Sequence, residues 1–102
     1  ANVLGPCIVT ADAIDPYAQT MVARVNGEEW SRGSSSTMKH RFEDCIAHVS
    51  QCETLWPGEI LGSGTVGGGS GIELGRMLSP GDLIELELSD IGVLRNRIVK
   101  RD

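Results

Sequence analysis

The sequence has few aromatic residues and no long apolar run. Phe, Trp and Tyr together make up 4% of the 102 residues, while glycine occurs 13 times, a balance that favours turns over a long helical bundle. No apolar stretch approaches the roughly 18 residues of a membrane-spanning helix, and no segment resembles a secretory leader. We therefore expect no membrane partner.

Cysteine is also scarce. Cys7, Cys45 and Cys52 cannot all pair within one chain, and so low a count does not describe a disulfide scaffold. A reducing, cytoplasmic location is the expectation.

Basic residues are outnumbered, with nine Lys and Arg against 14 Asp and Glu and a formal net charge of -5. Such a balance repels nucleic acid and anionic membranes unless a basic cluster interrupts it. Basic side chains concentrate only at 39–41 and 95–101, and the second run alternates with apolar residues as a solvated strand face does. The sequence predicts no nucleic-acid partner.

The length fits one domain over residues 1–102, large enough for a modest hydrophobic core. The chain begins with Ala1 instead of Met. We expect it to be the carboxy-terminal portion of a larger catalytic domain.

The first half predicts strands and turns. A β-branched run at 7–12 predicts a strand that ends at a turn containing Asp12, Asp15 and Pro16. Residues 20–25 alternate, and Asn26-Gly27 is a strong hairpin signal because both central residues of that turn need positive φ. Residues 28–31 would be the return strand, followed by a polar loop at 31–40.

The last 20 residues predict a second hairpin after a turn at "LSPGD". Ile84, Leu86 and Leu88 share one face, and a three-residue loop at 90–92 would place Gly92 where φ is left-handed. This register pairs opposite charges with each other and apolar side chains with each other. It pairs Leu88 with Leu94, Glu87 with Arg95, Leu86 with Asn96, Glu85 with Arg97, and Ile84 with Ile98.

One segment, 41–52, has helical periodicity. Its apolar face would comprise Phe42, Cys45, Ile46, Val49 and Cys52. Arg41 stands where an oxygen-bearing cap is usual, and the helix should end before Trp56-Pro57-Gly58.

The glycine-rich stretch "GSGTVGGGSG" at 62–71 permits several interpretations. Gly62, Gly64 and Gly67 match a dinucleotide fingerprint, but the glycines that follow oppose the helix which that fingerprint needs. A flexible linker fits poorly between strand-like segments. The remaining interpretations are a tight structural turn and a turn that offers backbone N–H groups with the Ser63 and Thr65 hydroxyls to an oxyanion.

Cys45, His48 and Cys52 have a spacing that could present soft ligands to zinc, with His40 as a fourth. The same spacing is explained without a metal by two thiols in the apolar face and a half-exposed imidazole. The carboxylates fit solvated faces, ion pairs or turns, and none forms an evident acid–base pair.

Six segments together resemble one known family. In order they are "GPCIVTADAI", "VNGEEW", "STMKHRFEDCIAHVSQ", "LWPGEILGSGT", "LSPGD" and "IGVLRNRI". Their order and spacing resemble the carboxy-terminal part of the fumarylacetoacetate hydrolase family, over residues 5–98.

The resemblance implies an α+β fold, a mainly antiparallel or mixed β-roll with one principal helix, here incomplete. It implies an enzyme, commonly a homodimer, that hydrolyses, decarboxylates or isomerises small oxo-acids on Mg2+ (or Mn2+ or Ca2+). In this family the threonine of the G-[ST]-G-T segment contacts substrate, which assigns substrate binding to Gly64 and Thr65. The family's Glu-x-Glu pair, Asp, lysine and lid histidine precede the matching region, so the resemblance assigns no catalytic or metal-binding residue to this chain.

Two hypotheses follow. The first is a fragment of such a metal-dependent enzyme, inactive alone, whose partners are an oxo-acid substrate and the remaining part of the enzyme. The second is a non-enzymatic β-rich interaction domain with the same fold. The coding sequence upstream of Ala1 discriminates between them. A fragment should also expose apolar surface and self-associate.

Overall fold

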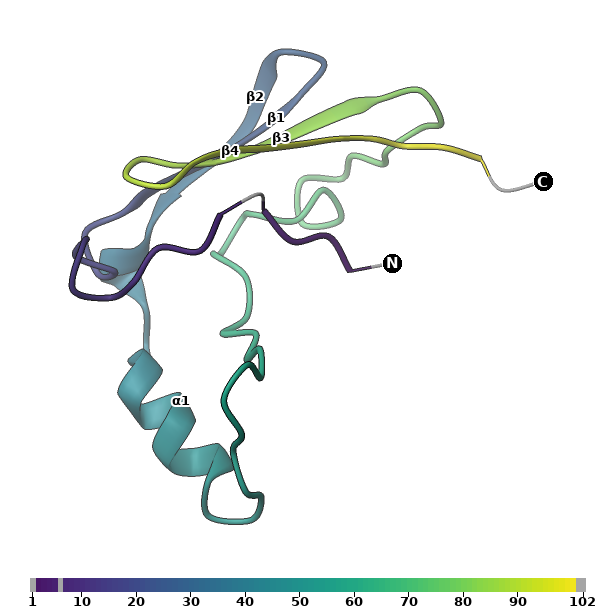
Figure 1. The fold of residues 1–102 in the computed structure, drawn as a ribbon. Coiled ribbons are helices and arrows are strands. Elements are labelled where there is room, and N and C mark those ends of the chain that lie inside the picture. The colour runs from purple at the N-terminus through teal and green to yellow at the C-terminus, as the bar shows by residue number, and fades with distance from the viewer. Residues whose placement is uncertain (1, 6, 101–102) are drawn as a thin grey trace.

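The computed structural model describes residues 2–5 and 7–100, so Pro6 and Arg101, from two of the segments above, lie outside the described part. Four strands form one sheet of order β2-β1-β3-β4, and every pair of neighbours is antiparallel (Figure 1). With one α-helix, the fold is α+β as predicted. The elements are β1 (Thr20–Val25), β2 (Glu28–Ser34), the short 3-10 helix η1 (Ser35–Thr37), α1 (Phe42–Val49), β3 (Leu83–Leu88) and β4 (Gly92–Arg97).

The first hairpin joins β1 to β2 through the predicted turn. Asn26 and Gly27 have φ values of 52° and 82°, which confirms the two left-handed positions. Strand β2 runs to Ser34, so the predicted polar loop at 31–40 is wrong over its first four residues. These polar residues pair with β1 because the ladder is made by backbone groups, whatever the side chains.

The second hairpin forms with a register two residues away from the predicted one. Leu88 pairs with Gly92, and Glu85 pairs with Arg95, whose Nε lies 2.8 Å from the Glu85 carboxylate. The loop comprises Ser89 to Ile91, and Gly92, with φ of 123°, is the first residue of β4. A shift of two residues leaves every side chain on the same face, so side-chain polarity could not distinguish the two registers.

The most enclosed side chain beside the sheet is polar. Gln19, 1% exposed, lies just before β1. Its Nε2 donates to the Asp15 carbonyl (2.8 Å) and to Asp90 Oδ2 (2.7 Å), while Oε1 accepts from the Ser89 hydroxyl and the Asp90 N–H. The Gln19 N–H donates to Ser35 Oγ at 2.9 Å. We call these five residues the Gln19 cluster. It ties the turn at 15–18 to both hairpins with every polar group of the Gln19 side chain satisfied.

The apolar core is small. Among the described residues, Val22 and Val25 are the only buried hydrophobic side chains. The segment after Cys7 forms no strand, and Ile8 is 96% exposed, so the predicted strand at 7–12 is wrong. The turn that follows is confirmed by the Asp15 carboxylate, which accepts from the Tyr17 N–H at 2.9 Å. In this structure no neighbouring strand gives the 7–12 run a ladder partner.

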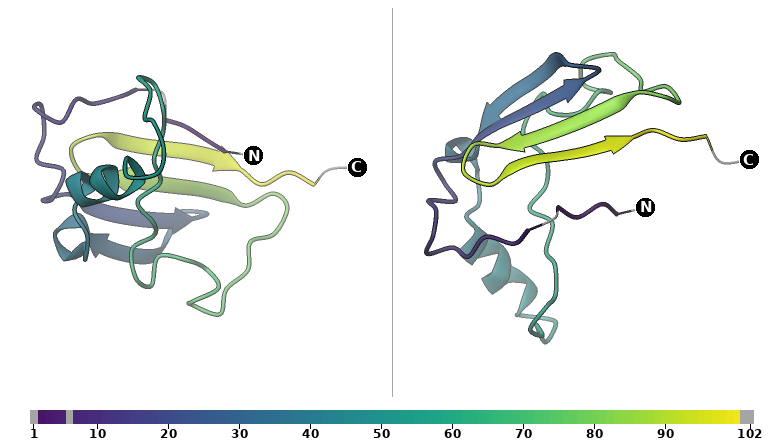
Figure 2. Two further views of the ribbon diagram at one scale, coloured as in Figure 1. Left: turned by 90° about the horizontal axis from the view of Figure 1, so that it is seen from below. Right: turned by 45° about the horizontal axis from the view of Figure 1, so that its top comes forward.

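Helix α1 projects away from the sheet, on the same side as the long connection that follows it (Figures 1 and 2). None of its residues is buried, and Ile46 is 49% exposed. The helix is where periodicity predicted it, but its apolar face is packed only in part. Phe42, Cys45 and Val49 are half-buried, whereas the expectation that Cys52 would be packed is wrong. Among the described residues the Tyr17 ring covers Phe42, whereas Ile46 and Cys52 stay uncovered.

Tyr17 caps the helix in place of the missing cap side chain at Arg41. The Tyr17 hydroxyl accepts from the Phe42 N–H at 3.0 Å and donates to the Glu43 carboxylate. Its ring stacks on Phe42 with centroids 5.5 Å apart, and the Arg41 guanidinium lies 4.8 Å from the ring centre. The Arg41 N–H is satisfied by Asp44 at 3.0 Å. A residue 25 positions earlier thus supplies the first-turn acceptor.

Candidate functional site

The glycine-rich stretch forms a turn that lies against strand β2. Gly64 and Gly68 have φ values of 89° and 72°, and the Gly69 N–H donates to the Val66 carbonyl at 2.8 Å. The Val66 side chain sits directly on Gly33 of β2, where an added Cβ would overlap Val66 Cγ1. The missing side chain at Gly33 therefore lets residues 62–67 approach the sheet.

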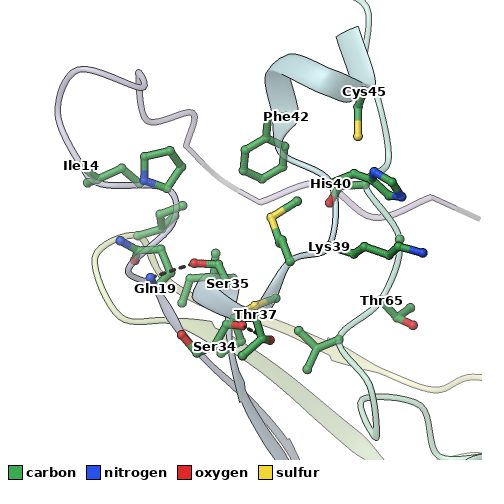
Figure 3. A pocket seen from close by; sticks show the side chains of 18 of the residues that line it. Ile14, Gln19, Ser34, Ser35, Thr37, Lys39, His40, Phe42, Cys45 and Thr65 are labelled. Atoms are coloured by element: carbon green, nitrogen blue, oxygen red, sulfur yellow. Dashed lines mark hydrogen bonds between the residues drawn. The ribbon is translucent and has the colours of Figure 1, made fainter. Parts of the chain in front are cut away.

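A cavity of about 650 Å³ lies between this turn, the end of β2 and the start of α1 (Figure 3). Met21 and Leu88, which belong to the sheet, form an apolar floor, and Phe42 adds an apolar side chain from the helix. Hydroxyl groups come from two segments, the end of β2 with η1 and the glycine turn: Ser34, Ser35, Thr37, Ser63 and Thr65. Lys39 and His40, from the connection between η1 and α1, and Gln19 also belong to the polar lining.

The two predicted substrate-binding residues both line this cavity. Gly64 and Thr65 are solvent-exposed members of its wall, next to Val66. Figure 3 shows Thr65 on the same side of the cavity as Lys39 and His40, opposite Ile14 and Gln19. This position is compatible with contact to a small molecule, and their role in binding stays a prediction.

Sequence reasoning did not assign Lys39, His40, Ser34 of β2 or Ser35 of η1 to the site. The basic concentration at 39–41 was visible in the sequence, but no small-molecule binding role was assigned to it. Its place beside the glycine turn depends on the Gly33–Val66 contact, which joins residues 33 positions apart. No short-range pattern reports such a contact.

The structure does not assemble the zinc ligand set considered from the sequence. Cys45 is half-buried and lines the cavity, whereas Cys52 is exposed beyond the end of α1. Across residues 2–5 and 7–100, no three His, Cys, Asp or Glu side chains lie close enough together to share an ion. The described residues therefore do not fit a magnesium site, which needs several convergent oxygen ligands.

The dinucleotide interpretation lacks its helix. The residues after Gly67 form turns, and no helix begins within the glycine-rich stretch. Asp82 lies in the predicted "LSPGD" turn, where its carboxylate accepts from the Ser79 N–H (2.7 Å) and from Asn26 Nδ2 (2.9 Å). These bonds, first that from Ser79, lower the pKa of Asp82 below its usual value. Asp82 thus stabilises the junction of two turns.

No helix in the described ranges combines the length and the apolarity needed to cross a membrane.

The fold and the site together define a class of protein. It is an antiparallel α+β unit with a glycine turn beside a cavity of small-molecule size. The sequence profile described as "Fumarylacetoacetate (FAA) hydrolase C-terminal" matches residues 1–99. The chain belongs to the fumarylacetoacetate hydrolase family, which confirms the resemblance drawn from its motifs.

Two mammalian relatives are named as oxaloacetate tautomerases. The chain is 41% identical over 101 residues to oxaloacetate tautomerase Fahd2a, mitochondrial, of Rattus norvegicus, covering 94% of this chain and 31% of that protein. The human protein named oxaloacetate tautomerase FAHD2A, mitochondrial, is 38% identical with the same coverage. This chain thus spans about a third of the length of these relatives.

Solved structures agree in fold. The fumarylacetoacetate hydrolase of the psychrophile Exiguobacterium antarcticum matches with a TM-score of 0.85 at 37% identity, over 95% of this chain and 35% of that one. Maleylpyruvate hydrolase from Sphingobium sp. SYK-6 matches with a TM-score of 0.82 at 28% identity, over the same shares.

Proposed function

We propose that this chain is the carboxy-terminal part of a metal-dependent enzyme that cleaves or rearranges small oxo-acids, and that it supplies one wall of the substrate pocket. The observation that carries the proposal is the position of Gly64 and Thr65 on the 650 Å³ cavity. The names of the relatives support it, since they comprise a tautomerase and hydrolases.

In this proposal Thr65 and Gly64 hold the carboxylate or oxo end of the substrate. The Thr65 hydroxyl donates to an anionic oxygen, and the left-handed conformation of Gly64 turns the backbone so that N–H groups of the segment serve as further donors. Hydrogen bonds to an ionised acceptor are stronger than neutral ones. The apolar floor of the cavity orients the carbon chain of the substrate and excludes water from it.

The divalent cation, Mg2+ with Mn2+ or Ca2+ as alternatives, is held in this proposal by residues outside this chain. When bound, such an ion stabilises the negative charge that develops on an oxo group. The described residues of this chain bind and orient substrate and contribute no ligand to the ion.

The exposed apolar side chains support the proposed protein partners. Ile8, Trp56 and Ile72 are each more than half exposed, on segments that have no regular structure. We propose that the rest of the enzyme covers these segments and that the complete enzyme is a homodimer in the cytoplasm. Both named mammalian relatives are described as mitochondrial, so cell fractionation is the direct test of location.

The decisive experiment uses the complete protein that contains this chain. The coding sequence upstream of Ala1 should encode Glu-x-Glu followed by Asp, and an unrelated upstream domain would favour the interaction-domain hypothesis. We expect Thr65→Ala to reduce kcat/KM for oxaloacetate about tenfold or more with Mg2+ present, because a hydrogen bond to a charged substrate is lost.

Two controls make this result specific. Thr65→Ser keeps the hydroxyl and should retain most of the activity. Ser70→Ala removes a hydroxyl from the same glycine-rich stretch, outside the cavity wall, and should leave kcat/KM unchanged. Equal activity of Thr65→Ala and the parent protein would refute the assigned role of Thr65.

A further inference from the structure

The cavity has an electrostatic character opposite to that of the chain. The whole sequence carries 14 acidic and nine basic residues. Yet no Asp or Glu is among the residues that line the cavity, and the lining includes Lys39 and His40. A site with one full positive charge and no carboxylate attracts anions even when the net charge of the chain is negative.

Lys39 also lacks the internal role that the arginines have. The four ion pairs among the described residues use Arg24, Arg32, Arg76 and Arg95. Arg41 stacks on Tyr17. The Lys39 ammonium makes no hydrogen bond to another described residue. An exposed ammonium at a cavity wall, not used by the fold, can bind an external anion.

The position of Lys39 relative to the glycine turn narrows the kind of anion. Lys39, His40 and Thr65 lie on one side of the cavity (Figure 3). A substrate whose first carboxylate accepts from the Thr65 hydroxyl can place a second carboxylate beside the Lys39 ammonium. The carbon chain between the two carboxylates would lie over the apolar floor formed by Met21 and Leu88.

We propose that Lys39 is a specificity-determining residue, which selects oxo-acids that carry a second carboxylate over those that carry one. This assignment rests on the proposed function. A monocarboxylate needs its single charged group at the reacting end, whereas a dicarboxylate places an additional charge within reach of Lys39. The ammonium acts as a point charge, so selection depends on charge more than on the shape of the anion.

The test compares binding of oxaloacetate, with two carboxylates, and pyruvate, with one, by calorimetry on the complete protein with Mg2+. The parent protein should bind oxaloacetate more tightly. Lys39→Met should reduce the ratio of the two dissociation constants about tenfold, mainly by weakening the binding of oxaloacetate, because it removes one charged hydrogen bond. Lys39→Arg should keep most of the preference. Added NaCl should narrow the preference of the parent protein and leave that of Lys39→Met unchanged.

Lys100→Met is the matched control, because it removes the same charge from the only other lysine, far along the chain and outside the cavity wall. An unchanged preference in Lys39→Met, with turnover intact, would overturn the assignment of Lys39 alone. An equal narrowing in Lys100→Met would also overturn it, by showing an effect of net charge. Failure of the parent protein to bind or convert any oxo-acid would refute the proposed function and, with it, this inference.

Discussion

The sheet and the connection beside it are stabilised in different ways. In the sheet half, strands β1 to β4 with the turn at 15–18, hydrogen bonds join residues up to 71 positions apart, and Gln19 is enclosed. In the arm, residues 38–78, most backbone hydrogen bonds link residues fewer than six positions apart. The sheet half is thus stabilised by its own long-range hydrogen bonds, while the position of the arm depends on a few contacts with the sheet half.

Tyr17 provides one of those contacts through its cap on α1, and strand β2 provides others. Val66 sits on Gly33, Arg76 pairs with Glu28 at 2.8 Å, and the Arg76 guanidinium lies 5.0 Å from the centre of the Trp30 ring. The cavity is lined by residues of both regions, so its shape is decided where they meet. A site at such a boundary is rigid on the sheet side and adjustable on the arm side.

The largest difference between the regions should appear when the same substitution is made in each. Gln19→Leu removes a side chain that makes four hydrogen bonds and leaves buried partners unsatisfied, so we expect a loss of about 3 kcal/mol in the free energy of unfolding. Gln51→Leu changes an exposed residue of the arm and should stay within about 0.5 kcal/mol. Urea denaturation of both variants measures this. Equal losses would contradict the comparison.

An intermediate effect is expected where the arm contacts the sheet. Gly33→Ala places a methyl group on Val66 and should cost about 1–2 kcal/mol, because either the strand or the turn must shift. The double variant Gly33→Ala/Val66→Ala should recover part of this loss, which a double-mutant cycle would detect.

Gly62→Ala is the control for that effect. An added Cβ at Gly62 meets nothing within 4 Å, so thermal unfolding should change little. A Gly33→Ala protein as stable as the parent would show that Val66 does not hold the arm against β2.

The smallest effect concerns acid stability. The pKa of Asp82 is lowered in the fold by hydrogen bonds from Ser79 and Asn26, so its contribution to stability is complete above the usual value of 3.8 and is lost as the pH falls through the folded pKa. Asp82→Asn should therefore flatten the fall in urea midpoint below about pH 4.

Asp12→Asn is the comparison for Asp82. The pKa of Asp12 is also lowered, first by a hydrogen bond from Thr10, but this bond lies within one turn and links no two elements. Substitution of Asp12 should therefore change the fall in urea midpoint below about pH 4 less than substitution of Asp82 does. An identical pH profile for the two variants would show that the bridge between the turns has no separate effect.

Local signals in the sequence predicted local structure well. Asn26-Gly27 specified its turn, and periodicity located α1, because both depend on neighbouring residues. Polarity assigned the faces of β3 and β4 but not their register, since a shift of two residues preserves faces.

Long-range contacts were the part that the sequence did not reveal. Tyr17 caps α1, and Val66 packs on Gly33. Both contacts join residues that are distant in the sequence, and no periodic pattern connects such positions. The motif resemblance pointed to Gly64 and Thr65, while Lys39 became a candidate only when the turn was placed beside it. The exposure of α1 also followed from what surrounds the helix, not from its own residues.

The strand order has one more consequence. Strands β2 and β4 are the outer members of the sheet, and among the described residues neither has a second neighbour. Each outer strand therefore presents backbone groups on which another strand could add by hydrogen bonding. Arg32 and Glu29 on one edge and Arg95 and Arg97 on the other place charges along these borders. Such charges oppose uncontrolled fibril growth while leaving the sheet able to extend with a matching strand.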